Sequence, residues 1–204
     1  MSIYESMPNS LLSETFVPDV YQKNIYAIDY EQLKKAKVKV VSFDIDDTIA
    51  PVEKSATDVA AAAFIDMLNG MGFQVMLLTK TGAEQAERLS DKYDVDCIVC
   101  EAPLPCYFEQ MQNRYREKYG ATLEREQIAH IGNNMLSDIA GANHFGCISC
   151  LVRNAGALSV NSGKSKEHEL RAVLLKKRIW RKHHFYEPDD QYYQLYDTPA
   201  AQWR

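Results

Sequence analysis

The sequence predicts an α/β fold with about five parallel strands and helices on both faces of the sheet. Short apolar runs recur along the chain, and the stretches between them have helical character. Strands that alternate with helices are typical of a parallel sheet covered on both faces. Polar residues follow several of these runs, at the edge where open parallel sheets bind ligands. The apolar runs are residues 40–44, 73–78, 95–100, 127–131 and 147–152, and the helices expected between them include 57–69, 82–93 and 106–119.

The composition is that of a globular chain. It has 204 residues, of which 46% are hydrophobic and 25% charged, and its net charge is −5. This length suits one domain with short tails. No apolar run reaches the length of a membrane span, and residues 1–10 lack the charged start and hydrophobic stretch of a secretory signal. We therefore expect a cytoplasmic protein.

The cysteines pose a choice between metal or redox sites and core packing. There are five of them, which excludes a fully paired disulfide framework. Two CxxC pairs occur, Cys97 with Cys100 and Cys147 with Cys150, and such pairs can bind zinc. Both pairs lie in strand-like runs, however, where residues three apart face opposite sides. We expect reduced thiols that fill core space, with zinc or redox roles as the alternative.

A dense group of carboxylates follows the strand at 40–44. Asp44 and Asp46 are two positions apart and can face one crevice, and Asp47 comes next. Three acids in four residues repel one another, and a divalent cation such as Mg²⁺ would relieve that repulsion. Asp44 could then attack a phosphorus atom, while Asp46 acts as acid and then as base. Thr48 could hold the loop by hydrogen bonding.

This Asp-x-Asp-x-Thr pattern after an apolar strand resembles the first motif of the haloacid dehalogenase-like (HAD) phosphohydrolases. Thr79, after the strand at 73–78, matches the hydroxyl of the second motif that holds phosphate. The run Gly-Asn-Asn-x-x-Ser-Asp-Ile-x-Gly-Ala, which begins at Gly132, resembles the fourth motif. The resemblance implies a Rossmann-like three-layer fold, an aspartyl-phosphate intermediate and Mg²⁺. The metal ligands that it implies are Asp44, Asp46, Asn133 and Asp138, and Thr48, Thr79 and Lys80 would bind the substrate.

Two positions depart from the HAD pattern. Asn133 stands where the fourth motif has its first acid, and its neutral amide should bind metal more weakly. Leu104 stands where the third motif has a lysine that neutralises the phosphate. Lys80 could supply this missing cation or could be a solvated surface lysine. Two functions therefore stay open: a Mg²⁺-dependent phosphatase, and a binding or regulatory protein built on a decayed HAD site.

The spacing of the motifs resembles the capless, YqeG-like branch of the family, which is similar to mitochondrial phosphatidylglycerophosphate phosphatase. This likeness covers about residues 15–155. The intervals 48–73 and 80–95 each have room for one helix and its loops, so no cap domain can be built. The site should therefore be open. An open site suits a phosphate carried by a protein, a lipid headgroup at a bilayer or a nucleic-acid end, and small sugar phosphates are also compatible.

The chain divides into four segments. Residues 1–37 form an N-terminal arm with two short helices, and Asp29 is placed to cap the second of them. Residues 38–153 form the HAD-like catalytic domain. Residues 154–185 comprise a linker and a basic helix, and residues 186–204 form a flexible tail rich in aromatic and acidic side chains.

The basic helix suggests a partner. Residues 166–184 contain seven Lys or Arg against two Glu. Such a helix can bind an anionic membrane surface or nucleic acid, which would place the protein at a membrane periphery. Lys177 and Arg181 interrupt its apolar face, which favours a solvated helix or one packed on the domain. Both alternatives stay open.

Overall fold

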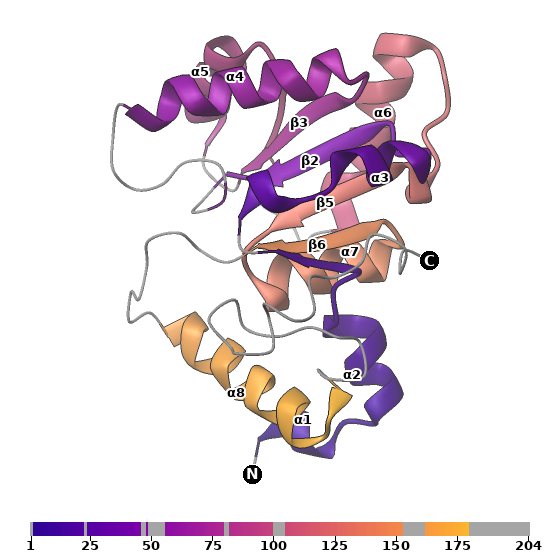
Figure 1. Ribbon diagram of the computed structural model, residues 1–204, viewed down its shortest axis with the longest axis vertical. Coiled ribbons are helices and arrows are strands. Elements are labelled where there is room, and N and C mark those ends of the chain that lie inside the picture. The colour runs from indigo at the N-terminus through magenta and orange to yellow at the C-terminus, as the bar shows by residue number, and fades with distance from the viewer. Residues whose placement is uncertain are drawn as a thin grey trace.

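The computed structural model describes residues 2–22, 24–45, 48, 56–79, 82–99, 105–152 and 162–179. Its centre is a wholly parallel six-stranded sheet with the strand order β1-β6-β5-β2-β3-β4 (Figure 1). The strands are β1 (Val20–Gln22), β2 (Val40–Asp44), β3 (Gln74–Thr79), β4 (Asp96–Val99), β5 (Ile128–Gly132) and β6 (Ile148–Val152). The described helices are α1 (Ile3–Ser6), α2 (Asn9–Phe16), η1 (Ile25–Ala27), α3 (Tyr30–Lys35), α4 (Ala56–Gly70), α5 (Ala83–Tyr93), α6 (Pro105–Tyr119), η2 (Arg125–Gln127), η3 (Met135–Ile139), α7 (Ala140–Phe145) and α8 (Ser162–Lys176).

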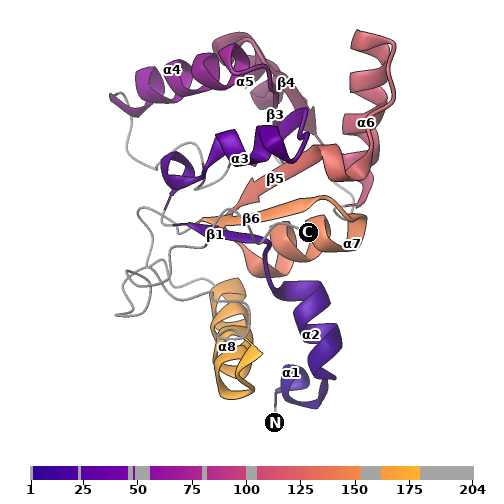
Figure 2. The same cartoon turned by 45° about the vertical axis from the view of Figure 1, so that its right-hand side comes forward.

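Helices cover both faces of the sheet, which confirms the predicted three-layer α/β fold (Figure 2). On one face the buried side chains of α3, α4 and α5 pack on alternate residues of the strands, including Phe43 and Leu77. On the other face Phe108 of α6 and Phe145 of α7 pack on residues such as Met76 and Ile128. The strands read as continuous apolar runs because both of their faces are buried.

The sheet has one strand more than predicted. β1 comes from the segment that the sequence predicts as a helical arm, and it pairs with β6 in the register Val20↔Cys150. Three residues are too few to show an alternation in the sequence, so this strand is defined by its pairing partner. In the same segment Asp29 caps α3 as predicted, because its Oδ1 accepts the Gln32 N–H at 3.0 Å.

A half-buried polar cluster fastens β1 to the sheet. The Asp19 carboxylate accepts the backbone N–H of Ser149 at 3.0 Å. The Ser149 hydroxyl lies 2.7 Å from the Asn143 side-chain oxygen. The Asn143 amide in turn donates to the carbonyl oxygens of Thr15 and Val17 at 3.1 and 3.0 Å. Side chains of α7 and β6 thus satisfy backbone groups that lead into the edge strand.

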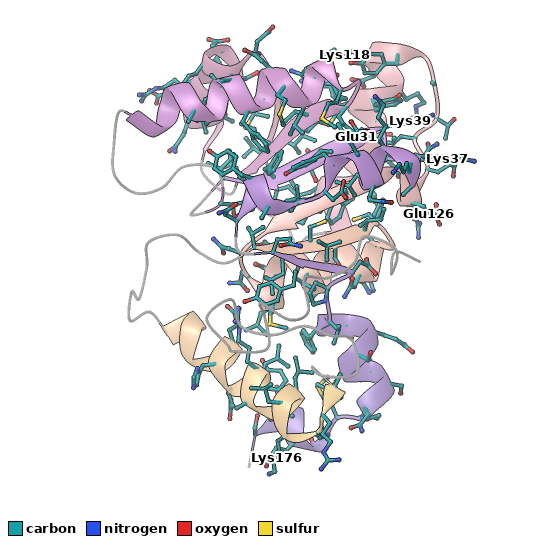
Figure 3. All side chains as sticks on the ribbon, viewed as in Figure 1. Glu31, Lys37, Lys39, Lys118, Glu126 and Lys176 are labelled. Carbon is teal, nitrogen blue, oxygen red and sulfur yellow. The ribbon has the colours of Figure 1, made fainter. Side chains whose placement is uncertain are left out.

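The basic segment begins as a helix that packs on the domain. α8 starts at Ser162, within the stretch that the composition predicts as linker, and its Leu170, Val173 and Leu174 are buried against residues of α1, α2 and η3. Lys176, labelled in Figure 3, forms a 2.6 Å ion pair with Glu5 of α1. The apolar face of this helix is therefore covered by the chain itself.

Cys147 and Cys150 face opposite sides of the sheet, as their spacing predicts. Cys147 packs in the cluster beneath α6 and α7, whereas Cys150 packs in the cluster on the opposite face. Burial raises the pKa of both thiols, and it raises the pKa of Cys97 to about 11. Thiols with raised pKa values are poor metal ligands and poor nucleophiles at neutral pH. Cys100, the partner of Cys97 in the first CxxC pair, lies outside the described residues.

In the described ranges, none of the helices combines the length and the hydropathy that a bilayer crossing requires.

The polar cluster predicts a stability effect. Asn143→Ala removes two donors from the carbonyl oxygens of Thr15 and Val17 and one acceptor from Ser149. We expect a loss of about 2 kcal/mol in the free energy of unfolding, because these partners are left partly unsatisfied. Denaturation in urea measures it. The matched control is His144→Ala, an exposed neighbour on α7 that should change stability by less than about 0.5 kcal/mol. Equal effects of the two substitutions would contradict the role given to the cluster.

Candidate active site

The predicted site begins at the carboxyl ends of β5, β2 and β3, which are neighbours in the sheet. Asp44 ends β2 half-buried, with its backbone in register with Leu78 of β3. Thr79 is the next residue of β3 and is 1% exposed. On the other side Phe43 pairs with Ile131, so the same register places Asp44 opposite Gly132, the last residue of β5. The fold therefore brings the first, second and fourth motifs to one edge of the sheet.

The loop after β2 starts with backbone hydrogen bonds. The N–H of Ile45 donates to the Leu78 carbonyl at 3.2 Å, which continues the pairing of β2 with β3 past Asp44. The N–H of Thr48 donates to the Ile45 carbonyl at 3.4 Å. Among the described residues the buried Thr48 hydroxyl has no hydrogen-bond partner. Thr48 thus contributes to the turn through its backbone, and its side chain is available for another group.

The fourth motif forms a tight turn around Asn134. The Asn134 side-chain oxygen accepts the N–H groups of Leu136 and Ser137 at 2.8 and 3.1 Å, which caps the π-helix η3. In return the Asp138 carboxylate accepts the Asn134 N–H at 3.0 Å and the Ser137 hydroxyl at 3.0 Å. Single-turn π-helices are frequent at functional sites because they redirect one side chain. Here the turn directs Asp138 back toward the end of β5.

Gly132 makes room for that carboxylate. A Cβ atom at this position would collide with the side chain of Asp138. Asp138 therefore lies over the last residue of β5, on the side where a residue-132 side chain would project. It is 4% exposed, so it occupies nearly closed space at the strand end. Any residue larger than glycine would displace it.

The burial of Asp138 bears on the predicted metal. Within the described part of the chain no Lys or Arg lies within ion-pair distance of this carboxylate. Buried carboxylates in proteins are paired, hydrogen-bonded or bound to metal, because an isolated charge is strongly disfavoured there. Each Asp138 oxygen accepts one hydrogen bond here and keeps a further lone pair.

The donor set suits a hard cation. Asp44 and Asp138 offer carboxylate oxygens and Asn133 an amide oxygen, which are ligands that Mg²⁺ accepts. No group of three or more His, Cys, Asp or Glu side chains with metal-binding geometry occurs among the described residues. The ligand set implied by the resemblance does not need one, since it combines carboxylates with an amide and a backbone carbonyl. The residues present are compatible with Mg²⁺ and poorly suited to zinc.

Three residues of the predicted site lie outside the described residues. They are Asp46, the predicted acid and base, Lys80, the predicted substitute cation, and Leu104, the departure in the third motif. Their roles stay predictions, as do the chemical roles of Asp44, Thr79 and Asp138, whose positions the structure gives.

The structure adds a polar pair that sequence reasoning missed. Ser42 and His130 are 0% and 1% exposed, and the Ser42 hydroxyl lies 3.0 Å from the Nδ1 atom of His130. They face each other across β2 and β5, two residues before Asp44 and Gly132. The available signal was the presence of a polar residue inside each of two apolar strands.

Burial lowers the pKa of His130, and the negative charge of Asp138 opposes this only in part. The ring is therefore neutral at pH 7.

This lowered pKa predicts how stability depends on pH. In the unfolded chain His130 titrates near pH 6.5, whereas in the folded chain it resists protonation until a lower pH. The unfolded state thus binds more protons below pH 6.5, and stability should fall as the pH drops from there toward the folded pKa. His130→Phe should flatten this part of the curve. Urea denaturation of both proteins between pH 5 and 8 tests it, and parallel curves would contradict the assignment.

Comparison with known proteins adds two sequence matches. A family model described as HAD-hydrolase-like matches residues 99–179. The probable phosphatase YqeG of Bacillus subtilis is 24% identical over 143 residues, which cover 70% of this chain and 80% of that protein. The family model spans the fourth motif, from β4 to α8.

The solved structures that resemble this chain include two proteins named as phosphatases. The 3-deoxy-D-manno-octulosonate 8-phosphate phosphatase of Moraxella catarrhalis, in complex with magnesium, phosphate and the sugar, is 13% identical and has a TM-score of 0.44, with 76% of this chain and 97% of that one covered. The core domain of a phosphoglycolate phosphatase from Streptococcus pneumoniae is 17% identical with a TM-score of 0.42, with coverage of 65% and 96%.

The sequence matches and the fold point in the same direction. The matched family model, the YqeG relative and the parallel sheet with its motifs at one edge agree with the resemblance read from the sequence. In sequence and in fold the chain is therefore similar to haloacid dehalogenase-like hydrolases of the phosphatase type.

Proposed function

We propose that this protein is a Mg²⁺-dependent phosphomonoester hydrolase that works through an aspartyl-phosphate on Asp44. The observation that carries the proposal is the meeting of three strand ends. They bring Asp44, Thr79 and the fourth motif to one edge of the sheet, where the backbone order is set by parallel pairing. A phosphate bound at this edge would have a nucleophile, a hydroxyl donor and buried acids around it.

The chemistry divides between two acids. An Asp44 oxygen forms a bond to phosphorus while the bond from phosphorus to the leaving oxygen breaks, and Asp46 gives that oxygen its proton. In the second half Asp46 takes a proton from water, which attacks phosphorus and releases inorganic phosphate from Asp44. Thr79 donates its hydroxyl to the phosphoryl oxygens, and Lys80 supplies positive charge next to it.

The metal would be held by oxygen atoms of this chain. Asp44, Asp138, Asn133 and the backbone carbonyl of Asp46 are its proposed ligands. When bound, Mg²⁺ supplies positive charge that draws the phosphate to Asp44 and offsets the repulsion between the two anions. Asn134 and Gly132 hold Asp138 in place through the capped turn and the free space at the end of β5.

The proposed substrate carries its phosphate on a large molecule. Between β2 and β3 the described chain contains α4, and between β3 and β4 it contains α5, which supports the capless branch and an open site. A phosphate presented by a protein, a lipid headgroup or a nucleic-acid end could reach such a site without a lid opening. For the basic segment, contact with an anionic surface stays a proposal. Such contact would use residues other than the apolar face of α8, which is buried in the domain. Lys177, just after this helix, already donates to the Met7 carbonyl at 2.7 Å.

The second candidate is a binding or regulatory protein on an impaired HAD site. Two substitutions favour it, Asn133 for an acid and Leu104 for a lysine. Loss of one donor aimed at transition-state charge costs about 3 kcal/mol, or about two orders of magnitude in rate. Such a site could bind a phosphorylated partner while turning it over slowly.

Asp44→Asn tests the nucleophile. The amide cannot form the covalent intermediate, so we expect turnover of p-nitrophenyl phosphate with Mg²⁺ to fall about 10³-fold or more. The matched control is Asp91→Asn, an exposed acid on α5, which should keep wild-type turnover. Activity that survives Asp44→Asn would reject the nucleophile, whereas an inactive wild type that still binds Mg²⁺ would favour the impaired site.

Asn133→Asp tests the metal ligands. A carboxylate adds charge where a neutral amide stands, so the substitution should tighten Mg²⁺ binding about tenfold. Titration calorimetry on both proteins measures the dissociation constants. Asn69→Asp adds the same charge at an exposed position on α4 and should leave the affinity unchanged. If Asn133→Asp behaves like this control, Asn133 does not face the ion.

A further inference from the structure

Two pairs of positions follow one another along β2 and β5 toward the active-site end of the sheet. The inner row is Ser42 with His130, and the outer row is Asp44 with Gly132. Ser42 pairs with His130 in the sheet register, and Asp44 follows Ser42 two residues later on the same face of β2. Gly132 follows His130 in the same way on β5, and the Asp138 carboxylate fills the space of its missing side chain. The outer row thus contains the acids of the proposed metal site. The inner row is the pair Ser42 and His130.

The inner row is polar although its surroundings are apolar. The ring of Phe108 meets the His130 ring edge-on with centroids 5.3 Å apart, and Phe108 stacks on Phe145 behind it. A phenylalanine at position 130 would suit such a pocket. One nitrogen of His130 is satisfied by Ser42, while Nε2 is buried and has no hydrogen-bond partner among the described residues. A buried polar atom of this kind is destabilising unless something nearby binds it.

Asp138 is placed to interact with the Nε2 atom of His130. Side chains two residues apart on one face of a strand are separated by about 7 Å, and an imidazole spans more than half of that distance. Nε2 makes no direct hydrogen bond to Asp138, so the separation of the ring and the carboxylate is one that a single bridging water would span. The field of Asp138 also acts on His130, since it raises the pKa that burial lowers.

The position of the ring proton follows from the two partners. A neutral imidazole carries its proton on one nitrogen, and the hydrogen bond at the other nitrogen determines which. If the Ser42 hydroxyl donates to Nδ1 over their 3.0 Å separation, the proton is on Nε2. An Nε2–H is attracted by a carboxylate, whereas an Nε2 lone pair would be repelled by it. The Ser42 hydroxyl could also donate to the Ala129 carbonyl at 3.4 Å and accept from an Nδ1–H, so it is compatible with either tautomer. The Asp138 carboxylate is the partner that favours the proton on Nε2.

We propose that His130 is a positioning residue whose Nε2–H holds the Asp138 carboxylate through one water, and that the Ser42 hydroxyl supports the required tautomer by donating to Nδ1. Neither residue touches the substrate. Partners of this kind behind a metal ligand typically change metal affinity by about 10- to 100-fold when removed. The consequence for Mg²⁺ rests on the proposed function, but the tautomer and its dependence on Asp138 do not.

Nitrogen NMR of the full chain tests the contact without any metal. Long-range ¹H–¹⁵N spectra of the ¹⁵N-labelled protein should show His130 neutral with its proton on Nε2. Asp138→Asn should shift the Nε2 resonance, while the exposed control Asp91→Asn should leave it in place. Ser42→Ala, which keeps Asp138, should let the Nδ1–H tautomer appear. A proton on Nδ1 in the wild type, or an Nε2 resonance that ignores Asp138→Asn, would overturn the proposal.

Calorimetry with Mg²⁺ separates positioning from packing. His130→Phe, which preserves a ring beside Phe108, should weaken binding about tenfold, and His130→Gln should recover part of the loss because its amide can donate. Phe108→Leu disturbs the same pocket without removing a polar atom, so it should lower thermal stability and keep the affinity within about twofold.

In an Asp138→Asn background, His130→Phe should have no further effect on Mg²⁺ affinity. An equal effect in both backgrounds would overturn positioning through Asp138, while a wild type without Mg²⁺ affinity would reject the proposed metal site and leave the NMR result to decide on His130.

Discussion

Parallel pairing of β2 with β5 on one side and β3 on the other is the constraint on which the candidate site depends. Parallel hydrogen bonding fixes which residues lie opposite each other, and it makes all strand ends of one polarity meet at one edge. Asp44, Thr79 and Gly132 are far apart in the chain, yet this register places them at the ends of three adjacent strands. The helices on both faces of the sheet hold this register by burying the apolar side chains of the strands.

Electrostatics at this edge is governed by burial. Asp138 lies in nearly closed space, where a charge interacts more strongly with its neighbours than it would in water. The described groups that meet it are neutral: the backbone of Asn134, the hydroxyl of Ser137 and, by our proposal, the ring of His130. Neutral donors orient a carboxylate without cancelling its charge, so its attraction for a cation is retained.

Much of the fold follows from the sequence because the central strands are apolar on both faces. This pattern located β2, β3, β4, β5 and β6, and the helices α4, α5 and α6 between them. β1 could not be found in this way, since its three residues form a strand only because β6 and the Asp19 cluster hold them there. At the site the motifs predicted Asp44, Thr79 and Asp138, and the fold brings these positions to one edge of the sheet. Ser42 and His130 were not recognised, because their pairing depends on a register that appears only when β2 and β5 are side by side.

The cluster formed by the two ends of the described chain bears on the order of folding. Tyr4, Leu12 and Phe16 of the N-terminal helices share one buried cluster with Leu170, Leu174 and Ile179 from the region of α8. Contacts between residues so distant in sequence can form only after residue 170 has been synthesised. Because α8 follows all six strands in the chain, its burial on Tyr4, Leu12 and Phe16 completes a cluster that contains both ends of the described chain.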